Sequence, residues 1–114
     1  MIKKGTHITT LGPDEPNKAE VSAELIERSL FICDDRKLAV NMGAIGGVGL
    51  DVKTIDAELG EVIDNKKLGR SNDDQITIFG MVGFPFQDLV GAWMVYQKAI
   101  KENVGLKINF LQSQ

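Results

Sequence analysis

THITTLGPDEPNK, residues 6–18, is the stretch that determines how the fold begins. Its first half, Thr6–Leu11, is rich in β-branched side chains, which favour strands. Its second half starts at Gly12 and contains two prolines, and these residue types favour turns and restrict the backbone. The stretch therefore predicts a strand that leads into a loop.

Further along the chain, β-prone runs alternate with helical patterns. We expect further strands at Leu30–Cys33, Gln75–Phe79 and Leu106–Leu111, and helices from Ser22 to about Ser29, over Arg36–Met42, after a cap at Thr54, and from Pro85 to a stop at Asn103–Gly105. The glycines between Gly43 and Gly49 are expected to break regular structure. This alternation predicts an α/β fold, with a small, mainly parallel sheet and flanking helices.

Two apolar patterns recur at helical spacing. The first is Ile55, Leu59, Val62 and Ile63, and the second is Phe86, Leu89, Val90, Trp93, Met94, Gln97 and Ile100. Each set falls on one face of a helix. We expect the second, which we call the apolar stripe, to be buried in the core or in an interface.

Composition restricts the class of protein. The 114 residues fit a single domain, residues 1–114, and 43% hydrophobic with 25% charged residues is an ordinary globular mixture. A net charge of −3 argues against nucleic acid or an anionic membrane as partner. One cysteine allows no intramolecular disulfide, and no apolar leader or spanning segment is visible, so a cytoplasmic location is expected.

The loop after the first strand is the best candidate for chemistry. Ligands of open α/β sheets bind beyond the carboxyl ends of strands, and this loop offers Gly12, Asp14 and Lys18 there. A carboxylate in a dry pocket can take a proton from an amine substrate and return it. On composition alone, Asp14 is more often a turn former than a catalytic carboxylate, and Lys18 is a solvated surface lysine.

Other candidate residues have structural interpretations. Cys33 lies in an apolar run and is expected to be a buried small hydrophobe, and His7 to fill a strand position. No zinc spacing is present, and Asn72–Asp74 lacks the glycine and closing glutamate of a calcium loop, so no metal site is expected. The glycines of Gly43–Gly49 do not have the G-x-G-x-x-G spacing of a dinucleotide-binding loop.

Three blocks of sequence resemble one protein family. Residues 6–21, THITTLGPDEPNKAEV, are similar to the G-x-H-I-x-x-V-G-x-D-x-P-x-K-x-E-L segment of the ornithine cyclodeaminase/μ-crystallin family. AELGEV (57–62) with LGRSNDDQITIF (68–79), and then VGFPFQDL (82–89), resemble later segments in the same order. The resemblance extends to about residue 100. It implies the second half of a Rossmann domain together with the C-terminal helix of that family.

The resemblance also implies residue roles. Family members use NAD(P) and act on amino acids or cyclic imines. Their active-site aspartate falls on Asp14, and a family contact near the substrate falls on Val82. The cofactor-binding positions fall on Leu11, Gly12, Pro13, Lys18 and Met81. Many members have glycine or alanine at position 13, glycine at 17 and a small polar residue at 81. A polar contact to the cofactor is therefore expected to be lost at Met81.

The resemblance covers the C-terminal part of a longer family chain, without the glycine-rich loop that anchors the cofactor diphosphate at a helix start. We therefore expect a truncated ornithine cyclodeaminase-like protein that binds no NAD(P) by itself, is not catalytic alone and self-associates as a homo-oligomer through the apolar stripe and Leu106–Leu111. The alternative is a part of an NAD(P)-dependent cyclodeaminase, dehydrogenase or imine reductase that completes its site with a separately encoded N-terminal partner. A third possibility is a small-ligand binder that uses the cleft near Asp14.

Overall fold

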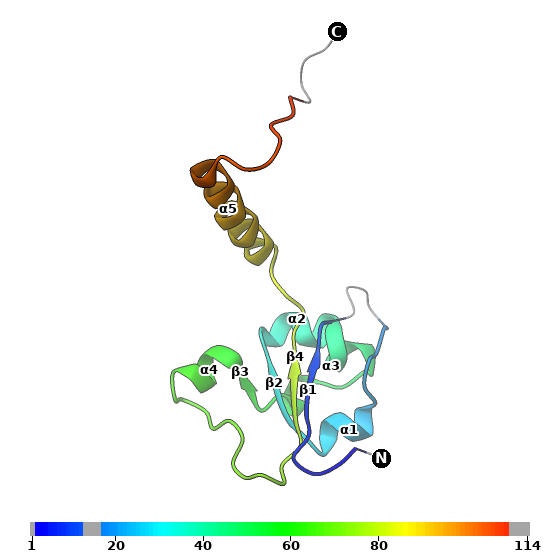
Figure 1. The fold of residues 1–114 in the computed structure, drawn as a ribbon. Coiled ribbons are helices and arrows are strands. Elements are labelled where there is room, and N and C mark those ends of the chain that lie inside the picture. Colours follow the sequence, from blue (N-terminus) through cyan, green and yellow to red (C-terminus); the bar gives the residue numbers. More distant parts are fainter. Residues whose placement is uncertain (1, 13–16, 110–114) are drawn as a thin grey trace. The chain divides into compact units, whose positions relative to one another are not determined.

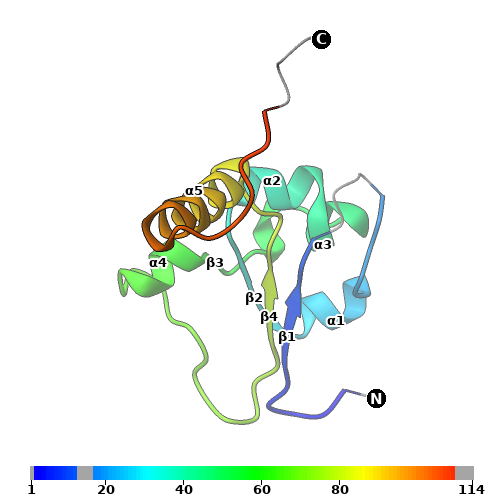
Figure 2. The same ribbon diagram turned by 45° about the horizontal axis from the view of Figure 1, so that its top comes forward.

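The computed structural model describes residues 2–12 and 17–109. The chain divides into a first unit that ends at Gly83 and a second unit that starts at Phe84, and each is described by itself. Figures 1 and 2 show the first unit as a sheet with helices and the second as one long helix with a C-terminal segment. The elements of the first unit are β1 (His7–Thr10), α1 (Ala23–Glu27), β2 (Leu30–Cys33), α2 (Arg36–Asn41), α3 (Gly43–Gly47), the 3₁₀ turn η1 (Val52–Thr54), β3 (Ala57–Glu58), α4 (Leu59–Ile63) and β4 (Thr77–Gly80).

The strands form a four-stranded sheet in the order β1-β4-β2-β3, and each pairing is parallel. Strand β4 pairs with β1 on one side (Ile8 with Ile78) and with β2 on the other (Phe31 with Ile78). The α/β fold with a small parallel sheet is therefore confirmed, and it resembles part of a Rossmann fold. Strand β1 lies at one edge of the sheet, and no strand in the described ranges pairs with its outer side.

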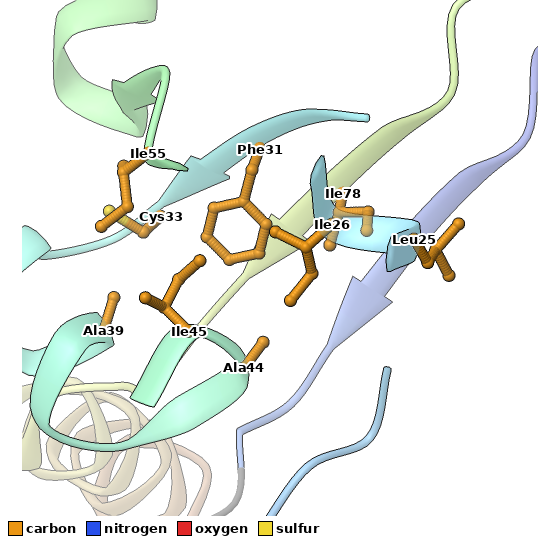
Figure 3. Packing of buried hydrophobic residues seen from close by; sticks show 9 residues of the cluster. All are labelled: Leu25, Ile26, Phe31, Cys33, Ala39, Ala44, Ile45, Ile55 and Ile78. Atoms are coloured by element: carbon orange, nitrogen blue, oxygen red, sulfur yellow. The ribbon is translucent and has the colours of Figure 1, made fainter. Parts of the chain in front are cut away.

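The core fills one face of this sheet. The ring of Phe31, from β2, lies at the centre of the cluster and is fully buried (Figure 3). Helices α1, α2 and α3 all contribute side chains to the cluster. It consists of Leu25, Ile26, Phe31, Cys33, Ala39, Ala44, Ile45, Ile55 and Ile78. A Cβ added at Gly80 would collide with the Phe31 ring, so the close packing of β4 on this ring requires glycine.

Local caps explain where the first helices begin. The Ser22 side chain accepts a hydrogen bond from Leu25 N–H at the start of α1, as predicted. The Asp35 carboxylate accepts one from Leu38 N–H, 2.8 Å away, at the start of α2. Both helices therefore begin where a side-chain oxygen satisfies an otherwise unpaired N–H group.

The prediction that Gly43–Gly49 breaks regular structure was wrong, because Gly43–Gly47 forms the short helix α3. A Cβ at Gly46 would collide with the Val40 carbonyl of α2, and one at Gly47 with the Lys18 carbonyl. The glycines allow the backbone of α3 to approach its neighbours closely. They serve tertiary packing, which local sequence preference does not report.

Two further predictions are corrected. Thr54 ends the 3₁₀ turn and caps no helix, and α4 begins at Leu59. The segment between them is extended because Ala57 pairs with Ile32 and the Asp56 carboxylate accepts the Phe31 N–H at 2.7 Å. The expected helix face is therefore split between a buried Ile55 and an exposed Ile63. The predicted strand Leu106–Leu111 is also wrong over residues 106–109, which form no strand, and its end lies outside the described residues.

The second unit contains α5, Pro85–Glu102, as the sequence predicted. The Gln87 side chain accepts the Phe84 N–H at its start, and Asn103 ends it in a left-handed conformation with φ of 54°. The apolar stripe lies on this helix, and its large side chains are exposed, with Trp93 at 56%. No helix in the described ranges is long and apolar enough to cross a membrane.

Candidate functional site

The carboxyl ends of β1 and β4 bring two predicted cofactor contacts together. Met81 N–H, just after β4, donates to the Thr10 carbonyl at the end of β1 over 3.1 Å. Gly12 has a φ of +74°, and a Cβ there would collide with the Met81 carbonyl oxygen. The Leu11–Gly12 turn therefore lies directly against Met81, and glycine is required by both conformation and space.

Val82, the predicted substrate contact, is held from two sides. Its N–H group donates to the Asp34 carboxylate at 2.9 Å, and the same oxygen accepts the Gly83 N–H at 2.6 Å. Its side chain packs beside Gly43 at the start of α3, where an added Cβ would lie 2.9 Å from the nearest Val82 methyl. The carboxyl ends of three strands, β1, β2 and β4, thus converge on the residues from Met81 to Gly83.

The structure describes only some of the other predicted site residues. Pro13 and the proposed catalytic Asp14 lie outside the described residues. Lys18 is exposed, with its main chain against Gly47. Asn17 adopts a φ of 65°, which glycine and asparagine tolerate better than other residues. The departure from the family glycine at this position is therefore compatible with the same turn.

Asp34 is a site residue that the sequence reasoning missed. It follows β2 directly, and its other carboxylate oxygen accepts the Asp35 N–H at 2.9 Å. A signal was available, because side chains that follow parallel strands gather at one edge of the sheet. In the sequence, Asp34 directly follows the apolar run of the predicted strand Leu30–Cys33.

Thr10 is the second feature that the sequence did not indicate. Its side chain is buried at 4% exposure at the end of β1, and its hydroxyl has no hydrogen-bond partner in the described structure. A buried hydroxyl without a partner costs about 1–3 kcal/mol. This unsatisfied group lies next to Leu11 and Gly12, on the strand that leads into the candidate site.

An ion-pair cluster lies near the carboxyl ends of strands β2 and β3. Arg36, at the start of α2, lies 2.8 Å from the Glu61 carboxylate, and the Glu58 N–H donates to the same Glu61 oxygen at 2.9 Å. The Glu58 N–H bond and the Arg36 guanidinium together lower the pKa of Glu61. Arg36 N–H also donates to Glu58 at 2.9 Å, so the cluster ties α2 to α4.

Cys33 and His7 take the structural roles that were expected. Cys33 is fully buried, where it packs as a small hydrophobe, and burial raises the pKa of its thiol to about 12. His7 lies in β1, with Nδ1 2.7 Å from the Thr77 hydroxyl and Nε2 3.2 Å from that of Thr9. Among the residues described, no group of three or more potential metal ligands is present.

A cavity lies on the sheet face opposite the core. Its volume is about 440 Å³, and its walls are mainly apolar side chains of the strands and α4, with His7 and Arg70 among them. The Arg70 guanidinium donates to the Gln75 carbonyl at 2.8 Å and to the Thr77 hydroxyl at 3.0 Å. These polar groups bind each other, so the cavity offers mainly apolar surface.

The described residues hold no Rossmann-type diphosphate-binding turn. The glycine at position 12 lets two backbone segments pack closely, because the Met81 carbonyl and the Val82 Cα fill the space that a side chain would take there. Diphosphate binding needs a glycine-rich turn between a strand and a helix. The glycine-rich helix α3 follows α2, and in the described ranges no strand leads directly into it. Helix α3 therefore lacks the strand–turn–helix arrangement that anchors a diphosphate.

This fold and site define a Rossmann-like α/β domain, and comparisons with known proteins give its family. The sequence profile of the ornithine cyclodeaminase/mu-crystallin family matches residues 1–103, and the chain belongs to this family. The chain is 37% identical over 116 residues to alanine dehydrogenase of Archaeoglobus fulgidus, and the alignment covers 97% of this chain and 36% of that protein. It thus spans about a third of the length of the relative it matches.

Two solved structures share the fold. An archaeal alanine dehydrogenase dimer with bound NAD has a TM-score of 0.80 and 37% identity, covering 96% of this chain and 36% of that one. Thermococcus litoralis Δ(1)-pyrroline-2-carboxylate reductase, in complex with NADH and L-proline, has a TM-score of 0.77 and 29% identity, covering 94% and 35%. The resemblance inferred from the three sequence blocks is confirmed at the level of the family and of its NAD(P) cofactor.

Proposed function

We propose that this chain supplies the nicotinamide side of an NAD(P)-dependent site that acts on amino acids or cyclic imines, and that it is not catalytic by itself. The observation that carries the proposal is the direct packing of the Leu11–Gly12 turn against Met81, beside Val82. The relatives named above act on alanine or on pyrroline-2-carboxylate. Cys33 is buried and free, which fits a reducing compartment and supports a cytoplasmic location.

Each residue has a distinct part in this proposal. The bound cofactor would supply or accept a hydride. The lack of a side chain at Gly12 lets the turn pack directly against the Met81 carbonyl, while Leu11, Pro13 and Met81 would offer apolar contact to the nicotinamide end and exclude water. Lys18 would contact the cofactor, and Val82 would contact the substrate. Asp14 would take a proton from the substrate nitrogen and return it, which is the task of a carboxylate with a raised pKa in a dry pocket.

The diphosphate anchor must come from elsewhere. The outer edge of β1 offers backbone N–H and C=O groups to an additional strand, and such an edge promotes pairing with another chain. The alignment leaves nearly two thirds of the alanine dehydrogenase without a counterpart. We propose that an N-terminal part of this type, encoded separately or in the same chain, pairs with β1 and supplies the phosphate-binding turn.

The test is a chimera with the A. fulgidus enzyme, in which this chain replaces the matching 36% of alanine dehydrogenase. We expect saturable NADH binding and turnover of alanine or pyrroline-2-carboxylate by the chimera, and neither by this chain alone. The Asp14→Asn chimera should bind NADH as before and lose turnover by about 10²-fold or more. Turnover by the isolated chain with added NADH, or a folded chimera that binds no NADH, would contradict the proposal.

A second candidate function is self-association, favoured by the exposed apolar stripe of α5. Leu89, Trp93 and Met94 are 69%, 56% and 65% exposed, and soluble proteins rarely leave a contiguous apolar patch of this kind bare. We propose that a second copy of the chain covers it. Light scattering at micromolar concentration should give a dimer or larger species, and Trp93→Glu should convert it to monomer, whereas Lys98→Glu should not. If the unsubstituted chain is monomeric under these conditions, self-association is excluded as its function.

A further inference from the structure

Asp34 binds the segment that carries the proposed nicotinamide and substrate contacts. One of its carboxylate oxygens accepts the N–H groups of both Val82 and Gly83, over 2.9 and 2.6 Å. Hydrogen bonds to an ionised acceptor are roughly twice as strong as neutral ones. Asp34 therefore holds two consecutive peptide groups directly after β4, from a position at the end of the neighbouring strand β2.

The same segment is held at two other points. Met81 N–H donates to the Thr10 carbonyl from β1, and Val82 packs beside Gly43 of α3. The Thr10 bond continues the β1–β4 pairing by one residue. Beyond Met81, the described structure shows no main-chain pairing for the N–H groups of Val82 and Gly83, and the Asp34 carboxylate takes both. The position of these two residues depends on this carboxylate.

We infer that Asp34 is a positioning residue, which holds the Met81–Gly83 segment at the spacing from Gly12 that the nicotinamide end of the cofactor requires. The inference rests on the proposed function and adds a specific residue to that site. Asp34 acts through Val82 and Gly83 and is not assigned contact with the cofactor. Without it, these two residues lose their shared acceptor and the segment moves away from the Leu11–Gly12 turn.

The test needs a control carboxylate that also accepts a backbone N–H group but lies away from the candidate site. The Asp56 carboxylate also accepts a backbone N–H group, that of Phe31 at 2.7 Å, but it lies just before β3, away from the carboxyl ends of the strands. Asp34→Asn and Asp56→Asn therefore both remove a carboxylate that binds main chain. If both variants merely destabilise the fold, they will behave alike in every measurement.

The first measurement is amide hydrogen exchange by NMR on the chain itself. In Asp34→Asn, we expect the amides of Val82 and Gly83 to exchange about tenfold faster or more, while those of Ile78 and Phe31 are unchanged. Asp56→Asn should accelerate hydrogen exchange at the Phe31 amide and leave exchange at the Val82 and Gly83 amides unchanged. Unaltered exchange at Val82 and Gly83 in Asp34→Asn would overturn the inference, whatever the chimera does.

The second measurement is NADH binding and turnover by the chimera with alanine dehydrogenase. We expect Asp34→Asn to weaken NADH binding about tenfold, Asp34→Ala to weaken it further, and Asp56→Asn to leave it unchanged at temperatures where all variants are folded. Equal NADH affinity in Asp34→Asn and the parent chimera would overturn the positioning role. A parent chimera that is folded and binds no NADH would instead overturn the proposed function, and with it the inference.

Discussion

The two units of this chain bury apolar side chains to very different extents. In the first, the Phe31 ring is fully buried under α1 and α3, and Ile26, Ile45 and Ile78 surround it (Figure 3). In the second, α5 is long and well capped but contains no buried residue. Apolar patterning of similar strength thus leads to a closed core in one unit and an open stripe in the other. The difference shows that periodicity indicates which face will be buried, while it does not identify what buries it.

The largest expected effect tests the closed core. Phe31→Ala removes the ring at the centre of the cluster, and the fixed sheet and helices leave a cavity that closes only in part. We expect a loss of about 3–5 kcal/mol in the free energy of unfolding, measured by urea denaturation of the chain. A loss below about 1 kcal/mol would show that the first unit is packed as loosely as α5.

A smaller change in the free energy of unfolding, of opposite sign, is expected when Thr10 is substituted. Thr10→Val keeps the shape of the side chain and removes a buried hydroxyl that has no partner among the described residues. We expect the free energy of unfolding to rise by about 1–3 kcal/mol, measured in the same urea series. Thr10→Ser, which keeps the hydroxyl, is the control and should not stabilise the chain. Destabilisation by valine would reveal that a water molecule or ligand binds this hydroxyl.

An alkaline transition should report the burial of Cys33. Its thiol has a pKa of about 12 in the folded state and 9.0 without burial, so the unfolded chain loses its proton first. The stability that this thiol contributes is therefore complete below pH 9 and is lost as pH rises through about 12. Urea unfolding from pH 8 to 11 should show the decline, and Cys33→Ala should flatten it. An identical slope in the variant would assign the decline to other groups.

The smallest effect is expected in the second unit. Trp93→Ala removes a side chain as large as any in the core, yet this side chain is more than half exposed. In dilute solution, where the chain is monomeric, we expect hydrogen exchange of the β4 amides to change by less than about threefold, since exposed substitutions alter stability by about 0.5 kcal/mol or less. A change of the size expected for Phe31→Ala would mean that α5 contributes to the first unit's stability.

Much of the fold could be predicted from the sequence. The helices α1, α2 and α5 begin at or beside their predicted starts, because Ser22, Asp35 and Pro85 act within a few residues of themselves. Strand β2 was predicted from a four-residue apolar run. Helix α3 and the extended segment before α4 were not predicted. Their conformations depend on Val40 and Phe31, which are neighbours in space that local patterns do not reveal.

The residues of the candidate site were chosen for a different reason, and their roles stay predictions. The resemblance to a family placed Leu11, Gly12, Met81 and Val82 in one site, although residues 12 and 81 are far apart in the chain, and the packing of Gly12 against the Met81 carbonyl agrees with it. The same resemblance assigned Asp14 its role, and that role stays a prediction. Asp34 was missed because its partners, the N–H groups of Val82 and Gly83, lie 48 and 49 residues away along the chain.

The sequence by itself determined the alternation of strands and helices, the cap at Ser22, the single cysteine and the family. These depend on short-range backbone preferences or on motifs that keep their order along the chain. Tertiary structure alone decided that Asp34 binds the segment after β4, that the glycines of α3 permit close packing, and that Thr10 finds no partner within the described ranges. Each of these results from distances between distant parts of the chain, and such distances exist only once the parallel sheet has formed.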